Sequence, residues 1–281
     1  MNCDVFICGS RADLSSGKID KTVIEVEPFD VEVMGQSYYK EKKALQLGFE
    51  EFRTRWEKEW HLLPRPQAGL IHWSQDELKS DFISTFDAHS DRELREALGE
   101  QCDYAYAAVW TIGAELEEAA EAFVNTSARQ GMFLDVAGSL MMGNIRKALH
   151  RYVGSLSEDG GRVVLGEHIP EISERDPRLR KIAAPWADAP EEERPGFSLN
   201  KNGVLHPLKS QCAMFFVGEP QPGAKSGWTR SPAPAARAAN AFTASSAAVI
   251  CPSTNSRSRG ATNKAASCFM QSAADPEQEP Q

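Results

Sequence analysis

Apolar and polar positions alternate in two stretches near the start of the chain. The segments VFIC at 5–8 and TVIEVEPFDVEVM at 22–34 are rich in β-branched residues, and such alternation is typical of strands with one covered face. From 39 to 60 apolar side chains recur at helical intervals among many charges, at Leu45, Leu47, Phe49, Phe52 and Trp56. We therefore expect strands followed by an amphipathic surface helix, which ends at the prolines of HLLPRPQ.

Serine N-caps mark two further short helices. The segments SQDELKSDFISTFD from Ser74 and SDRELREALGEQ from Ser90 each open with a serine that is soon followed by acids. A serine side chain accepts a hydrogen bond from the first helical turn, and acids there interact favourably with the helix dipole. Both segments are therefore predicted to be helical.

A strand that runs directly into a helix is the best-marked feature of the middle of the chain. The segment YAYAAVWT at 104–111 is apolar enough for a buried strand, and Gly113 and several acids follow it, as at a helix start. Two apolar stripes then predict two helices that pack antiparallel across the break at 125–131. The first stripe is Ile112, Leu116, Ala119, Ala120, Phe123 and Val124, and the second is Phe133, Ala137, Leu140, Met141, Ile145, Ala148, Leu149 and Tyr152. Residues 158–193 are rich in proline and acids and predict exposed connections.

Strands followed by helices in irregular order favour an α+β fold. We expect residues 1–94 to supply strands and helices to the same globular unit as residues 95–224. Beyond about residue 225 the composition changes abruptly, since 231–281 has no Leu, Tyr or His and is rich in Ala, Ser and Pro. Such a segment cannot build a core. It is either a disordered tail or the product of a shifted reading frame.

Charge and cysteine usage narrow the classes of partner. The net charge is −9, which repels nucleic acid and anionic membranes. No apolar stretch reaches the length of a membrane span, and the N-terminus lacks a secretory layout, so we expect a cytoplasmic protein. The six cysteines are scattered, which predicts reduced thiols and no zinc site. Signatures such as HExxH, GxSxG or a phosphate loop do not occur.

Three motifs follow one another between residues 95 and 217. They are T-x-G-x-E at Thr111, Gly113 and Glu115, then L-D-x-x-G-S at Leu134, Asp135, Gly138 and Ser139, then Arg194, Pro195, Gly196 and Phe197 with P-L-x-x-Q at Pro207, Leu208 and Gln211. In this order they resemble the activation (AdoMet-binding) domain of cobalamin-dependent methionine synthase, in a stand-alone form. The resemblance implies a twisted antiparallel sheet flanked by helices, and a helix over the apolar residues 214–217.

The resemblance also implies a function. Proteins of this kind hold AdoMet beside a corrinoid whose cobalt has become inactive, and an electron from flavodoxin or ferredoxin together with the AdoMet methyl group restores it. The chain would then be an AdoMet-binding accessory protein that reactivates a corrinoid methionine synthase or related corrinoid protein, with cobalamin supplied by the partner. The difficult chemistry belongs to cobalt and sulfonium, so this methyltransferase component needs no catalytic residue or metal ligand of its own.

Seven residues are the candidate AdoMet ligands that the resemblance implies. An arginine suits the methionyl carboxylate, and Arg194 is the candidate. The family spacing is R-x-x-P-G-Y, whereas Arg194 directly precedes Pro195, so Arg180 is the alternative if the acidic segment 186–193 is an insertion. The turn Pro195–Gly196 would let the backbone approach adenine and ribose, and Phe197 would pack on the ligand in place of the family tyrosine. Asp135 and Glu115 are candidates for the ribose hydroxyls or the α-ammonium group.

Structural roles compete with each assignment. Asp135 could be a helix-terminal charge, Arg194 a surface ion-pair partner, and Pro195–Gly196 a generic turn. His206 before Pro207 could line a site or cap a strand. Two other functional readings therefore stay open: a corrinoid-protein docking module that has lost AdoMet binding, or a frameshift-damaged homologue.

Overall fold

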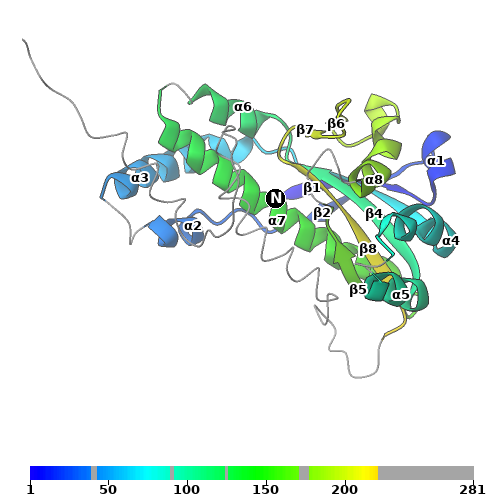
Figure 1. Cartoon of the computed structure of the whole chain (residues 1–281). Coiled ribbons are helices and arrows are strands. Elements are labelled where there is room, and N and C mark those ends of the chain that lie inside the picture. The colour runs from blue at the N-terminus through cyan, green and yellow to red at the C-terminus, as the bar shows by residue number, and fades with distance from the viewer. Residues whose placement is uncertain (39–42, 89–91, 124–125, 171–176, 221–281) are drawn as a thin grey trace, which may run out of the picture. The chain divides into compact units, whose positions relative to one another are not determined.

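A six-stranded mixed sheet organises the chain in the computed structural model, which describes residues 1–38, 43–88, 92–123, 126–170 and 177–220 (Figure 1). The strand order is β2-β1-β3-β4-β8-β5. The strands are β1 (Asn2–Cys8), β2 (Asp20–Glu25), β3 (Gln67–Ser74), β4 (Cys102–Thr111), β5 (Val163–His168) and β8 (Ser210–Gly218). Strands from residues 1–94 and from residues 95–224 share this sheet. The expected α+β class is confirmed.

The resemblance implied an antiparallel sheet, but the observed sheet is mixed. Strands β1 and β3 run parallel, whereas every other neighbouring pair is antiparallel. A parallel pair needs a crossover connection. Here the crossover includes β2 and the helices α2 (Val31–Tyr38) and α3 (Lys43–Lys58), which return the chain to the side of β1 away from β2.

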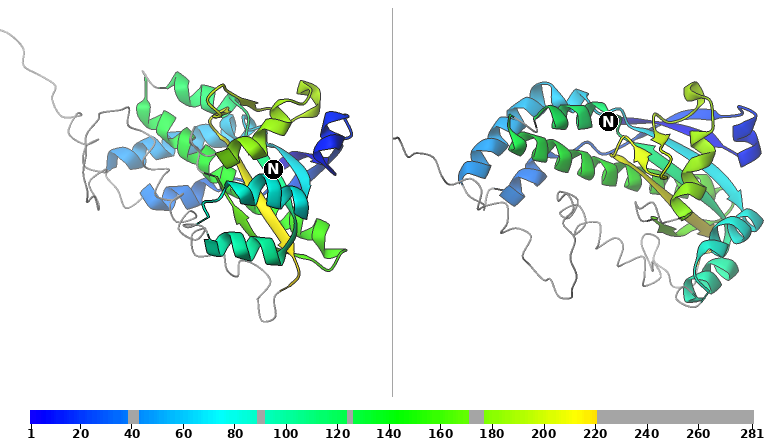
Figure 2. Two further views of the ribbon diagram at one scale, coloured as in Figure 1. Left: turned by 45° about the vertical axis from the view of Figure 1, so that its right-hand side comes forward. Right: turned by 45° about the horizontal axis from the view of Figure 1, so that its top comes forward.

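Helices cover both faces of the sheet and form two cores (Figures 1 and 2). Alternate residues of β4 point to opposite faces, so Ala108 and Trp110 enter one core while Ala107 and Val109 enter the other. The first core lies under α3, α6 (Glu115–Ala122) and α7 (Ala128–Glu158). The second lies under α1 (Arg11–Ser15), α5 (Arg92–Gln101) and α8 (Pro177–Ala187), together with the π turn η2 (Leu78–Phe82) and the 3-10 turn η3 (Ile83–Thr85), which follow the short helix α4 (Gln75–Glu77).

Helix α7 follows the predicted apolar stripe. Its 31 residues span about 46 Å at 1.5 Å per residue. Six of the eight stripe residues are buried, whereas Leu140 is 45% exposed and Tyr152 is half-buried. Helices α6 and α7 lie side by side in opposite directions, as expected (Figure 1). A Cβ at Gly131 would lie 2.9 Å from the Ala120 carbonyl oxygen, so glycine permits this close approach.

The predicted amphipathic helix is α3, which ends at Lys58, before the prolines; residues 39–42 lie outside the described part of the chain. Phe49, Phe52 and Trp56 are buried in the first core, whereas Leu47 is 63% exposed. The side chain of Leu45 lies outside the described residues. A short 3-10 turn, η1 (Trp60–Leu62), follows the helix before β3 begins.

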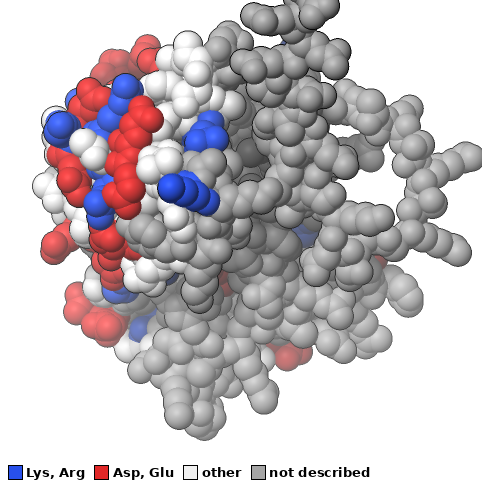
Figure 3. Space-filling view, turned by 90° about the vertical axis from the view of Figure 1, so that its left-hand side faces the viewer, with Lys and Arg blue, Asp and Glu red and all other residues white. Residues whose placement is uncertain are grey.

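Charges of both signs are intermixed at the α3 end of the molecule (Figure 3). Ion pairs there join Arg53 to Glu32 and Glu50, and Arg55 to Glu51. Among the described residues no helix is long and apolar enough to cross a membrane.

The serine caps are confirmed in part. Ser74 and Glu77 form a capping box, but the α-helix it starts soon becomes the π and 3-10 turns η2 and η3. The second segment forms α5, and its proposed cap, Ser90, lies outside the described residues, as does the whole of 225–281.

Three stretches in the first part of the chain and around α8 differ from the sequence prediction. Only the first part of 22–34 is a strand, because Asp30 accepts hydrogen bonds from the amides of Glu32 and Val33 and starts helix α2. Strand β3 was not expected. Residues 158–193 include the strand β5 and the helix α8, so they are not merely exposed connections.

The apolar segment after Gln211 is a strand and not a helix. All nine residues of β8 are buried, and β4 and β5 pair with its two edges. A strand buried on both faces is a continuous apolar run, which periodicity cannot distinguish from a buried helix.

Candidate functional site

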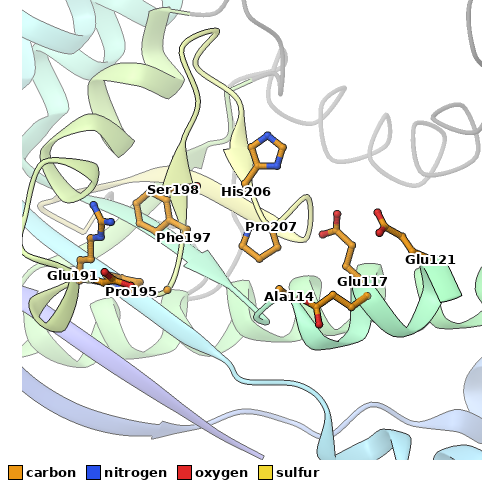
Figure 4. A pocket seen from close by; sticks show the side chains of 12 residues that line it. Ala114, Glu117, Glu121, Glu191, Pro195, Phe197, Ser198, His206 and Pro207 are labelled. Carbon is orange, nitrogen blue, oxygen red and sulfur yellow. The ribbon is translucent and has the colours of Figure 1, made fainter.

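A cleft of about 490 Å³ lies where the start of α6 meets the segment after α8 (Figure 4). Its lining residues are Ala114, Glu117, Glu118, Glu121, Glu191, Arg194, Pro195, Gly196, Phe197, Ser198, His206 and Pro207. The cleft therefore contains four of the seven candidate residues, which are the consecutive Arg194–Phe197.

These four residues are anchored to the sheet and to α8. The Gly196 amide donates a 2.6 Å hydrogen bond to Gln67 Oε1 on β3, and a Cβ at Gly196 would lie 2.9 Å from that oxygen. Arg194 Nη1 donates to the Ala187 carbonyl at the end of α8. Phe197 is 4% exposed and belongs to the second core. The segment is thus a fixed part of the cleft wall.

A short hairpin supplies another wall. Strands β6 (Ser198–Leu199) and β7 (Leu205–His206) pair antiparallel. Asn200 Oδ1 accepts from the amides of Asn202 and Val204, and Gly203 adopts φ +82°, a conformation that favours glycine. His206 Nε2 lies 3.2 Å from Asn200 Nδ2. His206 was expected either to line a site or to cap a strand, and it lines the cleft.

Glutamates dominate the charge of the cleft. Glu117 and Glu121 lie one turn apart on α6 and rise on the same side, toward Pro207 and His206, while Glu191 lies at the far end (Figure 4). Glu117 Oε2 accepts a 2.7 Å hydrogen bond from the Leu208 amide, so this carboxylate is held in place. With Glu118, four glutamates face one arginine, so the cleft attracts positively charged groups.

Sequence reasoning missed these glutamates as site residues. The acids of α6 were interpreted only as the start of a helix, which they also are. The four-residue spacing of Glu117 and Glu121 puts them on one side of the helix, whereas Glu191 lies at least 70 positions further along the chain. No local signal could have placed Glu191 beside them.

The other three candidates do not line the cleft. Asp135 Oδ1 lies 2.6 Å from Lys209 Nζ. Glu115 lies 3.9 Å from Arg65 Nε. Arg180 Nη2 donates a 3.2 Å hydrogen bond to the Lys201 carbonyl. Each therefore has a contact within the protein and lies outside the cleft lining that Arg194–Phe197 share.

Three of the described cysteines have raised pKa values, and the described residues group no metal ligands. Cys3, Cys8, Cys102 and Cys212 are free and buried. Burial raises the pKa of Cys3 to about 12 and the pKa values of Cys8 and Cys102 to about 11, so these thiols are protonated at neutral pH. Within the described ranges no three His, Cys, Asp or Glu side chains are grouped to hold a metal ion. Cys251 and Cys268 lie outside those ranges.

Comparison with known proteins gives no family for the chain. No protein-family model matches it, and no curated protein matches it.

Proposed function

We propose that the chain binds AdoMet in this cleft and acts as an accessory protein for the reductive reactivation of a cobalamin-dependent methionine synthase or related corrinoid protein. One observation carries the proposal. The four consecutive residues that the resemblance assigns to AdoMet, Arg194–Phe197, all line one cleft whose opposite side is acidic. The corrinoid would come from the partner protein and the electron from flavodoxin or ferredoxin.

The charge and size of the cleft support a ligand of this kind. AdoMet has a positive sulfonium, a positive α-ammonium group and one carboxylate. Glu117 and Glu121 suit the positive centres, and the Arg194 guanidinium, which has five N–H donors, suits the carboxylate. The volume of about 490 Å³ lies within the range of roughly 300–1,000 Å³ that is usual for small-molecule sites.

The chain's own residues would bind and orient the ligand. When bound, AdoMet supplies the methyl group, and its sulfonium leaves as the neutral thioether S-adenosylhomocysteine. Pro195, Gly196 and Phe197 would hold the adenosyl part by apolar contact, without the hydrogen bond that a tyrosine at 197 would add. The buried position of Phe197 allows its ring to contact a ligand only along one edge of the cleft.

Isothermal titration calorimetry with AdoMet and S-adenosylhomocysteine tests the proposal. We expect AdoMet to bind more tightly, because only AdoMet has the sulfonium charge that the glutamates attract. Replacing Glu121→Gln should weaken AdoMet binding about two- to fivefold, as expected for a solvent-exposed charge pair. Glu57→Gln on α3 is the matched control, since Glu57 is exposed and does not line the cleft. A folded protein that gives no binding heat at millimolar AdoMet would refute the proposal.

A docking module that has lost AdoMet binding is the second candidate. It is favoured by the internal use of two key residues, since Arg194 Nη1 already donates to Ala187 and Phe197 is already packed in the core. Co-purification with a corrinoid methionine synthase that lacks its own activation domain, together with an unchanged melting temperature in AdoMet, would support this candidate over the first.

A further inference from the structure

Lys209 joins three separate parts of the fold. Its Nζ lies 2.6 Å from Asp135 Oδ1 and donates a 2.9 Å hydrogen bond to Ser139 Oγ, both on α7. Its carbonyl accepts hydrogen bonds from Ile112 N (3.3 Å) and Thr111 Oγ1 (3.2 Å), where β4 ends. The side chain of Lys209 is 18% exposed. This one residue therefore fixes the start of β8 to both α7 and β4.

Helix α7 is shaped to receive the lysine stem. Asp135 and Ser139 are four residues apart, so they lie on the same side of the helix. Gly138 lies between them, and a Cβ at Gly138 would meet Lys209 Cε at 3.4 Å and Ile112 Cδ1 at 3.2 Å. The absence of a side chain at Gly138 leaves space on α7 for the lysine side chain. Asp135, Gly138 and Ser139 of the L-D-x-x-G-S motif thus lie against Lys209, and they do not line the cleft.

The residues just before Lys209 form the cleft wall. His206 and Pro207 line the cleft, and the Leu208 amide donates to Glu117 Oε2 at 2.7 Å. Consecutive Cα atoms are about 3.8 Å apart, so a displacement of Lys209 is transmitted directly to Leu208 and Pro207. The same displacement would release the Glu117 carboxylate from its backbone donor.

We propose that Lys209 is the positioning residue of the cleft. It does not itself line the cleft, and it acts by holding Pro207 and, through Leu208, the carboxylate of Glu117. The identity of the ligand rests on the proposed function, whereas the positioning itself is a property of the protein alone. Both can therefore be tested separately.

The test compares Lys209→Met, which keeps the stem and removes the charge, with Lys209→Arg, which keeps the charge. Arg146→Met is the matched control, because Arg146 also joins α7 to a strand of the sheet, through Glu167 on β5 at 3.6 Å, and does not line the cleft. Comparing melting temperatures shows whether each variant is folded at the temperature of measurement. Amide hydrogen exchange by NMR at Leu208 and Ile112 then reports on the wall without any ligand.

We expect Lys209→Met to speed exchange at both amides by about tenfold, the scale of one lost charged hydrogen bond, while Lys209→Arg restores slow exchange and Arg146→Met leaves it unchanged. AdoMet affinity should fall in parallel by about tenfold in Lys209→Met, whereas in Arg146→Met it should stay within about twofold of the wild-type value. Unchanged exchange in Lys209→Met, or equal acceleration in Arg146→Met, overturns the positioning role. Equal AdoMet affinity of the wild type and Lys209→Met also overturns it. If the wild type binds no AdoMet, the proposed function fails, and hydrogen exchange alone decides the role of Lys209.

Discussion

The contact between Gly69 and Trp186 allows a sharp test of how α8 sits on the sheet. Gly69 lies in β3, and the fully buried indole of Trp186 packs directly over it. A Cβ at Gly69 would lie 2.4 Å from Trp186 Cε2 and 2.8 Å from Cζ2 and Nε1. Ordinary contacts begin near 3.4 Å, so Gly69→Ala requires the ring or the strand to move by about 1 Å in a close-packed core.

The expected cost follows from this overlap. Overpacking of a core costs roughly 1–3 kcal/mol, and the smaller entropy of the unfolded alanine chain returns about 0.4–1 kcal/mol. We expect Gly69→Ala to lower the free energy of unfolding by about 1–2 kcal/mol. Gly154→Ala is the control with the opposite sign. Gly154 lies inside α7, and a Cβ there would meet no neighbouring atom of the described chain within 4 Å, so alanine should stabilise by roughly 0.5–1 kcal/mol.

Urea denaturation followed by circular dichroism measures both changes. With a slope of about 2 kcal/mol/M, Gly69→Ala should lower the midpoint by roughly 0.5–1 M. The double variant Gly69→Ala/Trp186→Phe should be more stable than the sum of the single changes predicts, because the smaller ring relieves the overlap. If Gly69→Ala were as stable as Gly154→Ala, or if the two changes were additive, the described packing of α8 would be wrong. The result bears on the cleft, because Ala187, next to Trp186, is the partner of Arg194.

Three further outcomes are expected. Phe52→Ala should lower the free energy of unfolding by about 3–5 kcal/mol, because Phe52 is fully buried among aromatic rings; a loss below about 1 kcal/mol in urea denaturation would contradict this. Burial lowers the pKa of His150 below 6.5, so the unfolded chain binds the proton more readily, and the free energy of unfolding should fall as the pH falls below about 6.5. Urea denaturation of the wild type and of His150→Gln at about pH 7.5 and 5.5 should show a smaller loss of stability at the lower pH in the variant. Burial raises the pKa of Cys3 to about 12 and of Cys102 to about 11, so mass spectrometry should find both unmodified by a thiol reagent at about pH 8 until denaturant is added, and rapid native labelling would show that they are accessible.

The centre of the fold was predictable from two long signals. The segment 104–111 is an apolar run that leads directly into the acids of a helix start, and α7 carries an apolar stripe at helical spacing. Strand β3 carries no such signal: Ala68, Leu70, Ile71 and Trp73 are all buried, since helices cover both faces and the alternation disappears. The helix that the resemblance implied over 214–217 is strand β8, and this continuous apolar run gave no alternation that could correct the expectation. In the opposite sense, the alternating segment DVEVM suggested a strand, but the Asp30 cap starts a helix there.

The candidate site was predictable only where it is local in sequence. Arg194–Phe197 are consecutive, so one motif brought them to the cleft together. Asp135 was assigned to the ligand because its type and motif suit that role, but its partner is Lys209, more than 70 positions away. Glu117 and Glu191 line the same cleft only because α6 lies near the segment after α8, which no spacing along the chain expresses.

The place of β8 in the sheet constrains how the protein is made. It is the last described strand along the chain, yet it lies between β4 and β5, which both leave the ribosome before it. A nascent chain that has emerged only as far as α8 therefore has an unpaired edge on β4 and no partner for β5. Unpaired strand edges and exposed apolar faces favour aggregation during synthesis. The interval between the emergence of β5 and that of β8 is therefore when a chaperone would protect the chain most.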